Sequence, residues 1–418
     1  MTAGPPRSRA TSERKLCAAP EAPLVQRRAA SHKARPTRSP RPQSTGHRSS
    51  SPLPRRRLTT HAPQTRSDWA GAHRAANPAL APGRCLVVGT SQGLRARVRP
   101  LRSPVLRVAS AREDGRREGP VELPLDAPGE LRRVARAGGF WAYVAGTALR
   151  LVTDFELDGG LDIDNWSTTL PLKKGLSSSA ASCVLVARAF SVAFGLRLSA
   201  RGEMAYAYAG ERETPSLCGR MDQALAFGPV PVSVSFDGDR LDVEQLSVGA
   251  PMFFLLVDLG GRKNTVLILA ALNGAYPVAA DARQEALQLT LGPANLKHVA
   301  AAEAAIAAGD LPALGATMTA AQRAFDAAAG PLCPSQLGPA GSPKLHALLG
   351  RADLRPFIFG GKGVGSQGDG TAQLLCRDAA AQAALMKVLQ ADGLSCLPLA
   401  VRPGGAGVPR SVVAPPAV

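Results

Sequence analysis

Hydrophobic and polar positions along the chain follow two periods, one typical of strands and one typical of helices. Residues 94–100 alternate strictly between apolar and polar, and residues 253–258 form a continuous apolar run that predicts a buried strand at the start of a second domain. The pattern predicts strands at 85–90, 94–100, 105–110, 162–172, 230–236, 241–246, 253–258, 357–359, 373–376 and 396–401. It predicts helices at 138–152, 180–195, 198–211, 277–289, 295–308, 311–328 and 379–390.

Charge divides the chain into a basic N-terminal part and a nearly neutral remainder. Residues 1–84 hold seventeen Lys or Arg and three acidic residues, which gives +14 of the formal net charge of +18. Residues 1–66 are rich in Arg, Ser and Pro and poor in large apolar side chains, so we expect a disordered extension. This composition is also typical of plastid or mitochondrial transit peptides, and an extension with no targeting role is an equally open interpretation. Because the basic segment lacks interleaved aromatic residues, we expect no nucleic-acid partner.

Cysteine spacing and hydropathy argue against a disulfide-rich or zinc-binding protein and against a membrane-spanning protein. The seven cysteines are scattered with no Cys-x2-Cys pair, which predicts reduced thiols and argues against a disulfide framework or a zinc site. No run approaches eighteen apolar residues without a charge, so we expect no transmembrane helix and no membrane partner. The expected location is cytoplasmic, with a plastid as the alternative if the extension is a transit peptide. The sequence sets no oligomeric state.

A turn rich in serine, residues 171–182, lies between a predicted strand and a predicted helix and is the strongest candidate for chemistry. Gly175 permits a close backbone approach, and Ser177, Ser178 and Ser179 supply hydroxyl and N–H groups at the helix start. The first N–H groups of a helix have no intrahelical partner and the dipole is positive there, which favours an anion, most often a phosphate. One serine would suffice for a helix cap. Three in a row behind two lysines therefore favour the phosphate site.

The pattern Pro-x3-Gly-Leu-Ser-Ser-Ser-Ala resembles the second motif of the superfamily of galactokinase, homoserine kinase, mevalonate kinase and phosphomevalonate kinase, the GHMP kinases. In that family the loop wraps the triphosphate of ATP and a Ser hydroxyl helps to hold Mg²⁺. The resemblance implies ATP and Mg²⁺ as cofactors and Ser178 as a metal ligand. Lys173 and Lys174 either neutralise phosphate charge or are exposed lysines at the end of the strand. The implied ATP phosphate-binding residues are Lys174, Gly175, Leu176, Ser177, Ser178, Ser179 and Ala180.

The segment Cys-Gly-Arg-Met-Asp-Gln, residues 218–223, resembles the galactokinase version of the segment that carries the catalytic Asp. In that role Asp222 would accept or orient the proton of the attacking hydroxyl, and Gly219 would contact the substrate. Glu211 precedes Asp222 by eleven residues, a spacing at which the family has a Glu that ligates Mg²⁺ with the loop Ser. One Glu and one Ser suit Mg²⁺, which keeps phosphate and water ligands. Glu213 is a competitor for this role, and either Glu is alternatively a solvated carboxylate at a helix end.

Residues 360–370 form a glycine-rich stretch directly after a predicted strand, at the position of the superfamily's third motif. The match is loose, because Gly-Lys-Gly-Val-Gly-Ser stands where the family has Gly-Ala-Gly-x-Gly-Gly. A glycine-rich loop alone is weak support, since many are flexible turns. The resemblance implies that Gly363 and Gly365 approach the substrate. Lys362 would then meet a phosphate as a point charge.

Residues 67–71, Ser-Asp-Trp-Ala-Gly, resemble the second half of the superfamily's first motif. In the sugar kinases the Asp of this motif, here Asp68, binds a sugar hydroxyl. Thr65 and Arg66 stand where the family has Glu and His, so the first half of the motif is missing. The resemblance therefore also allows a member of the family that binds nucleotide or sugar without turnover.

The resemblance spans residues 67–401 and implies an α+β fold with two domains. We expect an N-terminal ATP-binding domain at 67–250, a ferredoxin-like C-terminal domain at 251–402 and a loose tail at 403–418. The implied activity is transfer of the γ-phosphoryl group of Mg-ATP to a sugar hydroxyl, with galactokinase and arabinokinase as the nearest types and the anomeric hydroxyl as acceptor. ATP and a sugar would be the only partners expected. A mevalonate-type kinase and a catalytically impaired binding protein remain the alternatives.

Overall fold

The computed structural model of the 418-residue chain describes residues 71, 73–88, 92–112, 114–169, 177–216, 218–238 and 240–403. The predicted extension, most of the first motif, the loop residues 170–176 and the tail from 404 lie outside these residues. The predicted division between residues 250 and 251 remains a prediction. Within the described ranges, no helix is both long enough and apolar enough to cross a membrane.

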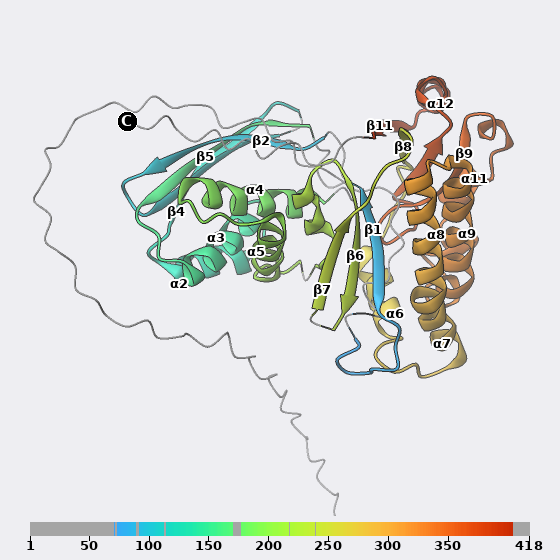
Figure 1. The fold of residues 1–418 in the computed structure, drawn as a ribbon, viewed down its shortest axis with the longest axis horizontal. Helices are drawn as coiled ribbons and strands as arrows, with labels where there is room; N and C mark the ends of the chain where they lie inside the picture. The colour runs from blue at the N-terminus through green and yellow to red at the C-terminus, as the bar shows by residue number, and fades with distance from the viewer. Residues whose placement is uncertain are drawn as a thin grey trace, which may run out of the picture. The chain divides into compact units, whose positions relative to one another are not determined.

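The strands of the described chain form three sheets (Figure 1). Sheet β1-β6-β7 is antiparallel, sheet β2-β5-β3-β4 is mixed because β3 and β5 run parallel, and sheet β11-β8-β10-β9 is antiparallel. Their bounds are β1 Gly83–Val88, β2 Leu94–Leu101, β3 Val105–Ala111, β4 Arg117–Pro124, β5 Gly160–Thr168, β6 Pro231–Asp237, β7 Arg240–Gln245, β8 Met252–Asp258, β9 Ile358–Gly363, β10 Thr371–Cys376 and β11 Ser395–Val401.

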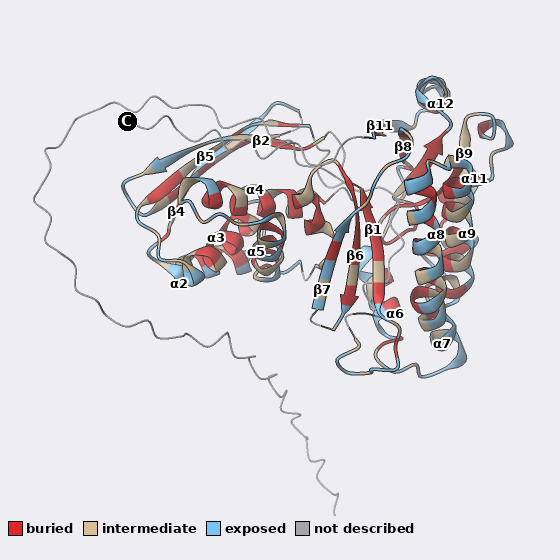
Figure 2. Ribbon diagram, viewed as in Figure 1, coloured by how far each residue is buried: buried red, intermediate tan, exposed pale blue. Residues whose placement is uncertain are grey.

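The helices comprise an N-terminal group and a C-terminal group. Helices α2 to α5 cover one face of the mixed sheet, as Figure 1 shows, and their buried residues meet the buried face of that sheet (Figure 2). The N-terminal bounds are α2 Pro128–Ala137, α3 Ala142–Asp154, α4 Ser178–Ala193, α5 Ala200–Arg212 and the 3-10 helix η1 Asp222–Phe227. The C-terminal bounds are α6 Thr265–Asn273, α7 Ala282–Leu289, η2 Thr290–Ala294, α8 Asn295–Ala308, α9 Leu311–Ala329, η3 Gly330–Leu332, α10 Gly338–Gly341, α11 Pro343–Gly350, η4 Ala352–Leu354 and α12 Ala379–Ala391.

The C-terminal sheet has the strand order of a ferredoxin-like fold. Counted along the chain from β8, the order β11-β8-β10-β9 places the fourth strand beside the first and the third beside the second. Helix α9 packs on β9, and α12 packs on β8 and β11. The α+β class and the ferredoxin-like C-terminal part predicted from the sequence are therefore confirmed.

Most of the elements predicted from periodicity exist, and the differences at their ends have local causes. The predicted helix at 138–152 begins only at Ala142, because Gly138 and Gly139 adopt positive φ angles of 74° and 87°. The predicted helix at 277–289 begins at Ala282, where the Asp281 side chain accepts a hydrogen bond from the Gln284 N–H and caps the helix. Ser199 caps α5 as predicted, accepting from the Gly202 N–H.

The sequence analysis missed strand β4 and helices α2, α6, α10 and α11. In β4 the Gly119–Pro120 pair reads as a turn, but β4 is an edge strand that pairs only with β3, where proline is tolerated. Helix α6 has only nine residues, so its apolar run resembles a buried strand as closely as a helix. These elements carry weak or ambiguous local signals.

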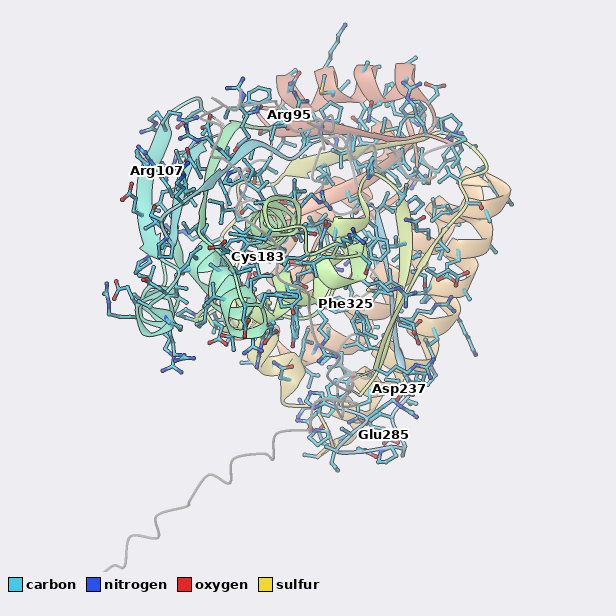
Figure 3. The ribbon with its side chains drawn as sticks, turned by 60° about the vertical axis from the view of Figure 1, so that its left-hand side comes forward. Arg95, Arg107, Cys183, Asp237, Glu285 and Phe325 are labelled. Carbon is cyan, nitrogen blue, oxygen red and sulfur yellow. The ribbon has the colours of Figure 1, made fainter. Side chains whose placement is uncertain are left out.

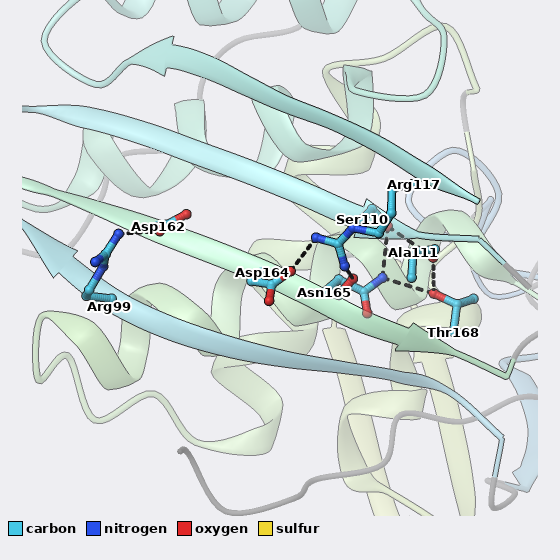
Figure 4. A network of polar contacts seen from close by, with 8 residues as sticks. All are labelled: Arg99, Ser110, Ala111, Arg117, Asp162, Asp164, Asn165 and Thr168. Atoms are coloured by element: carbon cyan, nitrogen blue, oxygen red, sulfur yellow. Dashed lines mark hydrogen bonds and ion pairs between the residues drawn. The ribbon is translucent and has the colours of Figure 1, made fainter. Parts of the chain in front are cut away.

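A polar network holds the end of β5, directly before the loop at 170–176 (Figure 4). The Asn165 side-chain amide lies 2.8 Å from Ser110 Oγ and 2.9 Å from Thr168 Oγ1. The Thr168 hydroxyl donates to the Ala111 carbonyl at 2.6 Å. Because these bonds join β5 to its neighbour β3, the chain enters the predicted phosphate loop from a fixed point.

Candidate active site

The predicted phosphate loop leads into α4 through a residue in an unusual backbone conformation. Ser177 has φ 53° and ψ 39°, in the left-handed region, and is the N-cap residue of α4 without a capping side-chain hydrogen bond. Non-glycine residues in this region cost about 1–3 kcal/mol and concentrate at ligand sites. Ser178 and Ser179 follow in the first turn and are half-buried, and Ala180 is buried. The first N–H groups of a helix have no partner within the helix, and donors of this kind commonly hold phosphate.

Glu211 is positioned by a close crossing of α3 and α5. A Cβ on Gly146 of α3 would lie 2.3 Å from the Gly210 carbonyl oxygen, and a Cβ on Gly210 would lie 2.4 Å from the Thr147 Cα. The two backbones can approach this closely only because both positions are glycine. Glu211 follows Gly210 directly in the last turn of α5, and only 2% of its surface is exposed.

The Glu211 carboxylate receives hydrogen bonds from three sides. Ser179 donates from the first turn of α4, the Gln223 amide Nε2 donates at 2.8 Å from η1, and the Cys218 thiol donates from the preceding segment. Burial raises the pKa of Glu211 and the nearby charge of Asp222 raises it further, while the Ser179 and Gln223 hydrogen bonds lower it. The net effect is a pKa above the ordinary value of a glutamate.

Asp222 lies at the start of η1 and is half-buried, close enough to Glu211 for the two charges to interact. Two carboxylates and a serine hydroxyl are thus gathered from α4, α5 and η1, three successive helices of the chain. Hard oxygen donors beside a phosphate site are the ligands that Mg²⁺ takes, usually with only one or two carboxylates from the protein. In the described ranges no group of three or more His, Cys, Asp and Glu side chains could hold a metal. Ser179, Glu211 and Asp222 are oxygen donors of the kind that Mg²⁺ takes when it is shared with a nucleotide.

A layer of buried groups lies behind this cluster. Burial raises the pKa of Cys218 and raises the pKa of Cys183 well above the ordinary value of a thiol, and the charge of Glu211 adds to both shifts. Cys183 lies on α4, within the helices that cover the mixed sheet (Figure 3). Burial raises the pKa of Tyr143 on α3 too, with Glu211 as the second cause. The thiolate is the reactive and metal-binding form of a cysteine, and burial disfavours it at both positions.

The third motif differs from the loop expected at 360–370. Strand β9 continues to Gly363, so the first four motif residues belong to the strand, and the β9–β10 connection follows. Gly360 is explained by packing, because its Cβ would lie 2.0 Å from the Gly315 carbonyl oxygen of α9. Lys362, expected to meet a phosphate, is only 2% exposed and donates from Nζ to the Gly363 carbonyl at 2.9 Å.

The predicted substrate-binding residues are spread over several segments. Gly363 is buried, and Gly365 lies in the β9–β10 connection with φ 64° and a Cβ position 3.8 Å from Lys263 Nζ. Gly219 is exposed, and it follows Cys218, which contacts Glu211, directly in the sequence. Asp68 lies outside the described residues, as do the loop residues Lys174, Gly175 and Leu176.

Two contacts of the cluster were not predicted. Ser179 hydrogen-bonds Glu211, whereas the resemblance implied Ser178 as the serine that holds the metal with Glu211. The metal role of Ser178 remains a prediction. The Gln223 bond to Glu211 was also missed. Gln223 follows the catalytic candidate Asp222 in the motif, and that adjacency was the one available signal.

A cavity of about 590 Å³ lies away from the Glu211 cluster, beside β1, β6, β7 and α8. Cations and acids both line it, including Arg84, Asp237 and Lys297. None of the groups that contact Glu211 lines this cavity, so the cavity is not part of the Glu211 cluster.

Comparison with known proteins agrees with this geometry. The GHMP kinases N terminal domain matches residues 142–228, a stretch that contains α3, the serines of α4, Glu211 and Asp222. A galactokinase from Thermococcus kodakarensis is 29% identical over 172 residues, which cover 41% of this chain and 47% of that protein. The matched stretch thus spans a little less than half the length of this relative.

Two solved structures show the same fold at low sequence identity. The galactokinase of Lactococcus lactis, solved with galactose, has a TM-score of 0.62 and 17% identity over 83% of this chain and 93% of its own. The mevalonate kinase of Methanococcus jannaschii has a TM-score of 0.59 and 15% identity over 84% and 98%. The chain therefore has the fold of these kinases, and residues 142–228 match the GHMP kinases N terminal domain, in agreement with the resemblance to the superfamily and to its galactokinase-like members.

Proposed function

We propose that the protein is an ATP-dependent kinase that transfers a phosphoryl group to a hydroxyl of a small sugar, with the anomeric hydroxyl as acceptor. The observation that carries this proposal is the meeting of Ser179, Glu211 and Asp222 at the start of the predicted phosphate helix. Phosphoryl transfer needs positioning, charge stabilisation and a group that orients the nucleophile more than it needs covalent chemistry from the protein. The cluster supplies those functions.

The roles follow from the position of each group. The first-turn N–H groups of α4 and the loop before it would hold the phosphates of ATP. Glu211 and Ser179 would hold Mg²⁺, which neutralises the charge that develops on the phosphoryl oxygens. We assign the metal-binding hydroxyl to Ser179, because it contacts Glu211. Asp222, half-buried at the start of η1, would accept or orient the proton of the acceptor hydroxyl.

The choice of a sugar as acceptor rests on sequence similarity and on two motifs. A galactokinase is 29% identical to this chain over 172 residues, and Cys-Gly-Arg-Met-Asp-Gln at 218–223 resembles the galactokinase form of its motif. The fold alone is equally compatible with a mevalonate-type kinase. Thr65 and Arg66, in place of the family's Glu and His, favour a third possibility, a protein that binds nucleotide or sugar with little turnover.

Mg²⁺-dependent ATP consumption tests the proposal directly. The purified chain is offered free hexoses, pentoses and sugar acids, with mevalonate and homoserine in parallel. We expect turnover with one sugar and none with its 1-deoxy analogue, which keeps every hydroxyl except the anomeric one. A product in which the phosphate sits at another carbon would refute the anomeric assignment.

The other outcomes separate the alternatives. Turnover of mevalonate without turnover of any sugar would replace the sugar assignment with the mevalonate-type one. Nucleotide binding without turnover of any acceptor would contradict the kinase activity and favour the binding protein.

A further inference from the structure

Gln223 is fully buried and connects the segment that carries Asp222 with the carboxylate of Glu211. It follows Asp222 in η1, and its amide Nε2 donates to Glu211 Oε2 at 2.8 Å. The same nitrogen lies 3.4 Å from Cys218 Sγ. A single side chain thus links the segment of the proposed base to the proposed metal carboxylate at the end of α5.

The oxygen of the Gln223 side-chain amide, Oε1, lowers the stability of the folded state. In the described part of the chain this oxygen is buried and has no hydrogen-bond partner. An unsatisfied buried acceptor loses its hydration without compensation, so a methionine of similar length would fit this interior better. Since stability does not favour glutamine here, its N–H toward Glu211 is the property that distinguishes it from an apolar residue.

We propose that Gln223 is a positioning residue that fixes the Glu211 carboxylate for Mg²⁺ and ties its position to that of Asp222. This inference rests on the proposed function. Glu211 stands in the last turn of α5, and hydrogen bonds from Ser179, Gln223 and Cys218 orient its side chain. Ser179 would also bind the metal through its hydroxyl, whereas the Gln223 amide would keep its hydrogen bond to the Glu211 carboxylate. Partners behind a metal ligand of this kind commonly change metal affinity by about 10- to 100-fold.

The test compares the binding of a non-hydrolysable ATP analogue with and without Mg²⁺ by calorimetry, so that the readout does not depend on turnover. In the wild-type protein Mg²⁺ should increase the affinity. In Gln223→Met this Mg²⁺-dependent gain should fall by roughly tenfold or more, while affinity without Mg²⁺ changes little. In assays of turnover the Met variant should need more Mg²⁺ for half-maximal rate, with a much smaller loss at saturating Mg²⁺.

Two further variants separate positioning from packing. Gln223→Leu removes the whole amide and offers Glu211 no hydrogen bond, so the same loss is expected, and it decides the question if the Met variant fails to fold. Gln382→Met is the matched control, because Gln382 donates to the Phe254 and Leu399 carbonyls at 2.6 and 2.9 Å in the C-terminal sheet. It should lower thermal stability and leave the Mg²⁺-dependent gain at the wild-type value.

A folded Gln223 variant that keeps the wild-type gain would overturn the inference. A wild-type protein that shows no gain from Mg²⁺ would overturn it together with the proposed metal role. If the wild-type protein binds Mg-nucleotide but turns over no acceptor, the kinase activity fails, and the binding comparison still decides the role of Gln223.

Discussion

Two buried polar clusters of the described chain differ in how fully their groups are paired. In the cluster around Glu211, burial and a second carboxylate raise the pKa of Glu211, and Gln223 Oε1 has no partner in the described ranges. In the cluster around Asp326, between α9 and α11, the polar side-chain atoms of Gln322 and Asp326 have hydrogen-bond partners. Gln322 Nε2 donates to Asp326 Oδ1 at 3.0 Å, His346 Nε2 lies 2.9 Å from Asp326 Oδ2, and the Gly363 N–H donates to Gln322 Oε1 at 2.7 Å.

The difference separates a functional site from a structural one. A satisfied buried network rigidifies the fold, whereas a network that leaves a charge desolvated and an acceptor unpaired opposes folding. Such a cluster persists in a protein when it does something besides stabilise it. The Glu211 cluster should therefore be dispensable for stability and needed for activity, and the Asp326 cluster should show the reverse.

Glu211→Gln should produce the largest effect of the substitutions that separate the clusters. Loss of the carboxylate should reduce Mg²⁺-dependent turnover by roughly a hundredfold or more, since a metal stabilises charge by several kcal/mol. Because the pKa of Glu211 is raised, the folded state favours the protonated form, and the ionised carboxylate opposes folding above that pKa. The variant should therefore unfold at a higher temperature than wild type at pH 8, with a smaller difference at pH 4.5. Equal or lower stability at pH 8 would contradict the claim that this carboxylate is a burden on the fold.

Gly210→Ala should damage both stability and activity, because it acts on the helix crossing that carries Glu211. The added Cβ would meet the Thr147 backbone at 2.4 Å, so we expect a loss of about 3 kcal/mol in unfolding free energy and weaker Mg²⁺-dependent turnover. Gly202→Ala on the same helix is the matched control, since its Cβ would make ordinary van der Waals contacts, with the Leu198 side chain at 3.5 Å and Ser199 Oγ at 3.7 Å. Chemical denaturation of both variants measures the difference. Equal stability of the two would rule out the close crossing.

Asp326→Ala should destabilise the protein without affecting the chemistry. Removing an acceptor shared by Gln322 and His346 should lower the unfolding free energy by about 1.5 kcal/mol. Turnover per folded molecule should stay near the wild-type value. Asp326→Asn keeps an acceptor for Gln322 and should lose less. A variant that is stable but inactive would assign this cluster to the active site instead.

His346 should give the smallest effect, a change of stability with pH. Burial lowers the pKa of His346, but hydrogen bonds from its ring to the Ser342 carbonyl and to Asp326 outweigh burial and raise it above its ordinary value. A raised histidine pKa adds stability that is complete below the unfolded value of about 6.5 and is lost as pH rises through the folded value. Thermal midpoints should therefore fall over that window more steeply in wild type than in His346→Gln. Parallel curves would show that the histidine is not charged in the folded state.

The sequence predicted the fold well where periodicity and end signals agree. Helix α8 has the predicted bounds, and the caps of α5 and α12 are a Ser and an Asp placed directly before apolar periodicity. Short elements such as α6 and the proline-containing edge strand β4 escaped prediction, because their local signals fit more than one structure. The glycines of β9 were read as a loop, although Gly360 is required by the close approach of α9.

The candidate site could be predicted only as far as the motif resemblance reached. Glu211 and Asp222 were identified from the resemblance to the family's motifs, and the structure brings them together. The choice between Ser178 and Ser179 depends on the helix register at the start of α4, and the bond from Gln223 depends on how η1 meets α5. Neither the helix register nor the packing of η1 on α5 can be predicted from the local sequence pattern.

The measurement that tests the central claim most directly is Mg²⁺-dependent ATP consumption by Asp222→Asn, with nucleotide binding followed in the same preparation. Loss of a general base should reduce turnover of the accepted sugar by roughly a thousandfold, with nucleotide affinity and thermal midpoint close to wild type. Because the variant keeps the shape of the side chain, this combination would locate the chemistry in the Glu211 cluster. Wild-type turnover by the variant would show that Asp222 is not the base and that the cluster has another role.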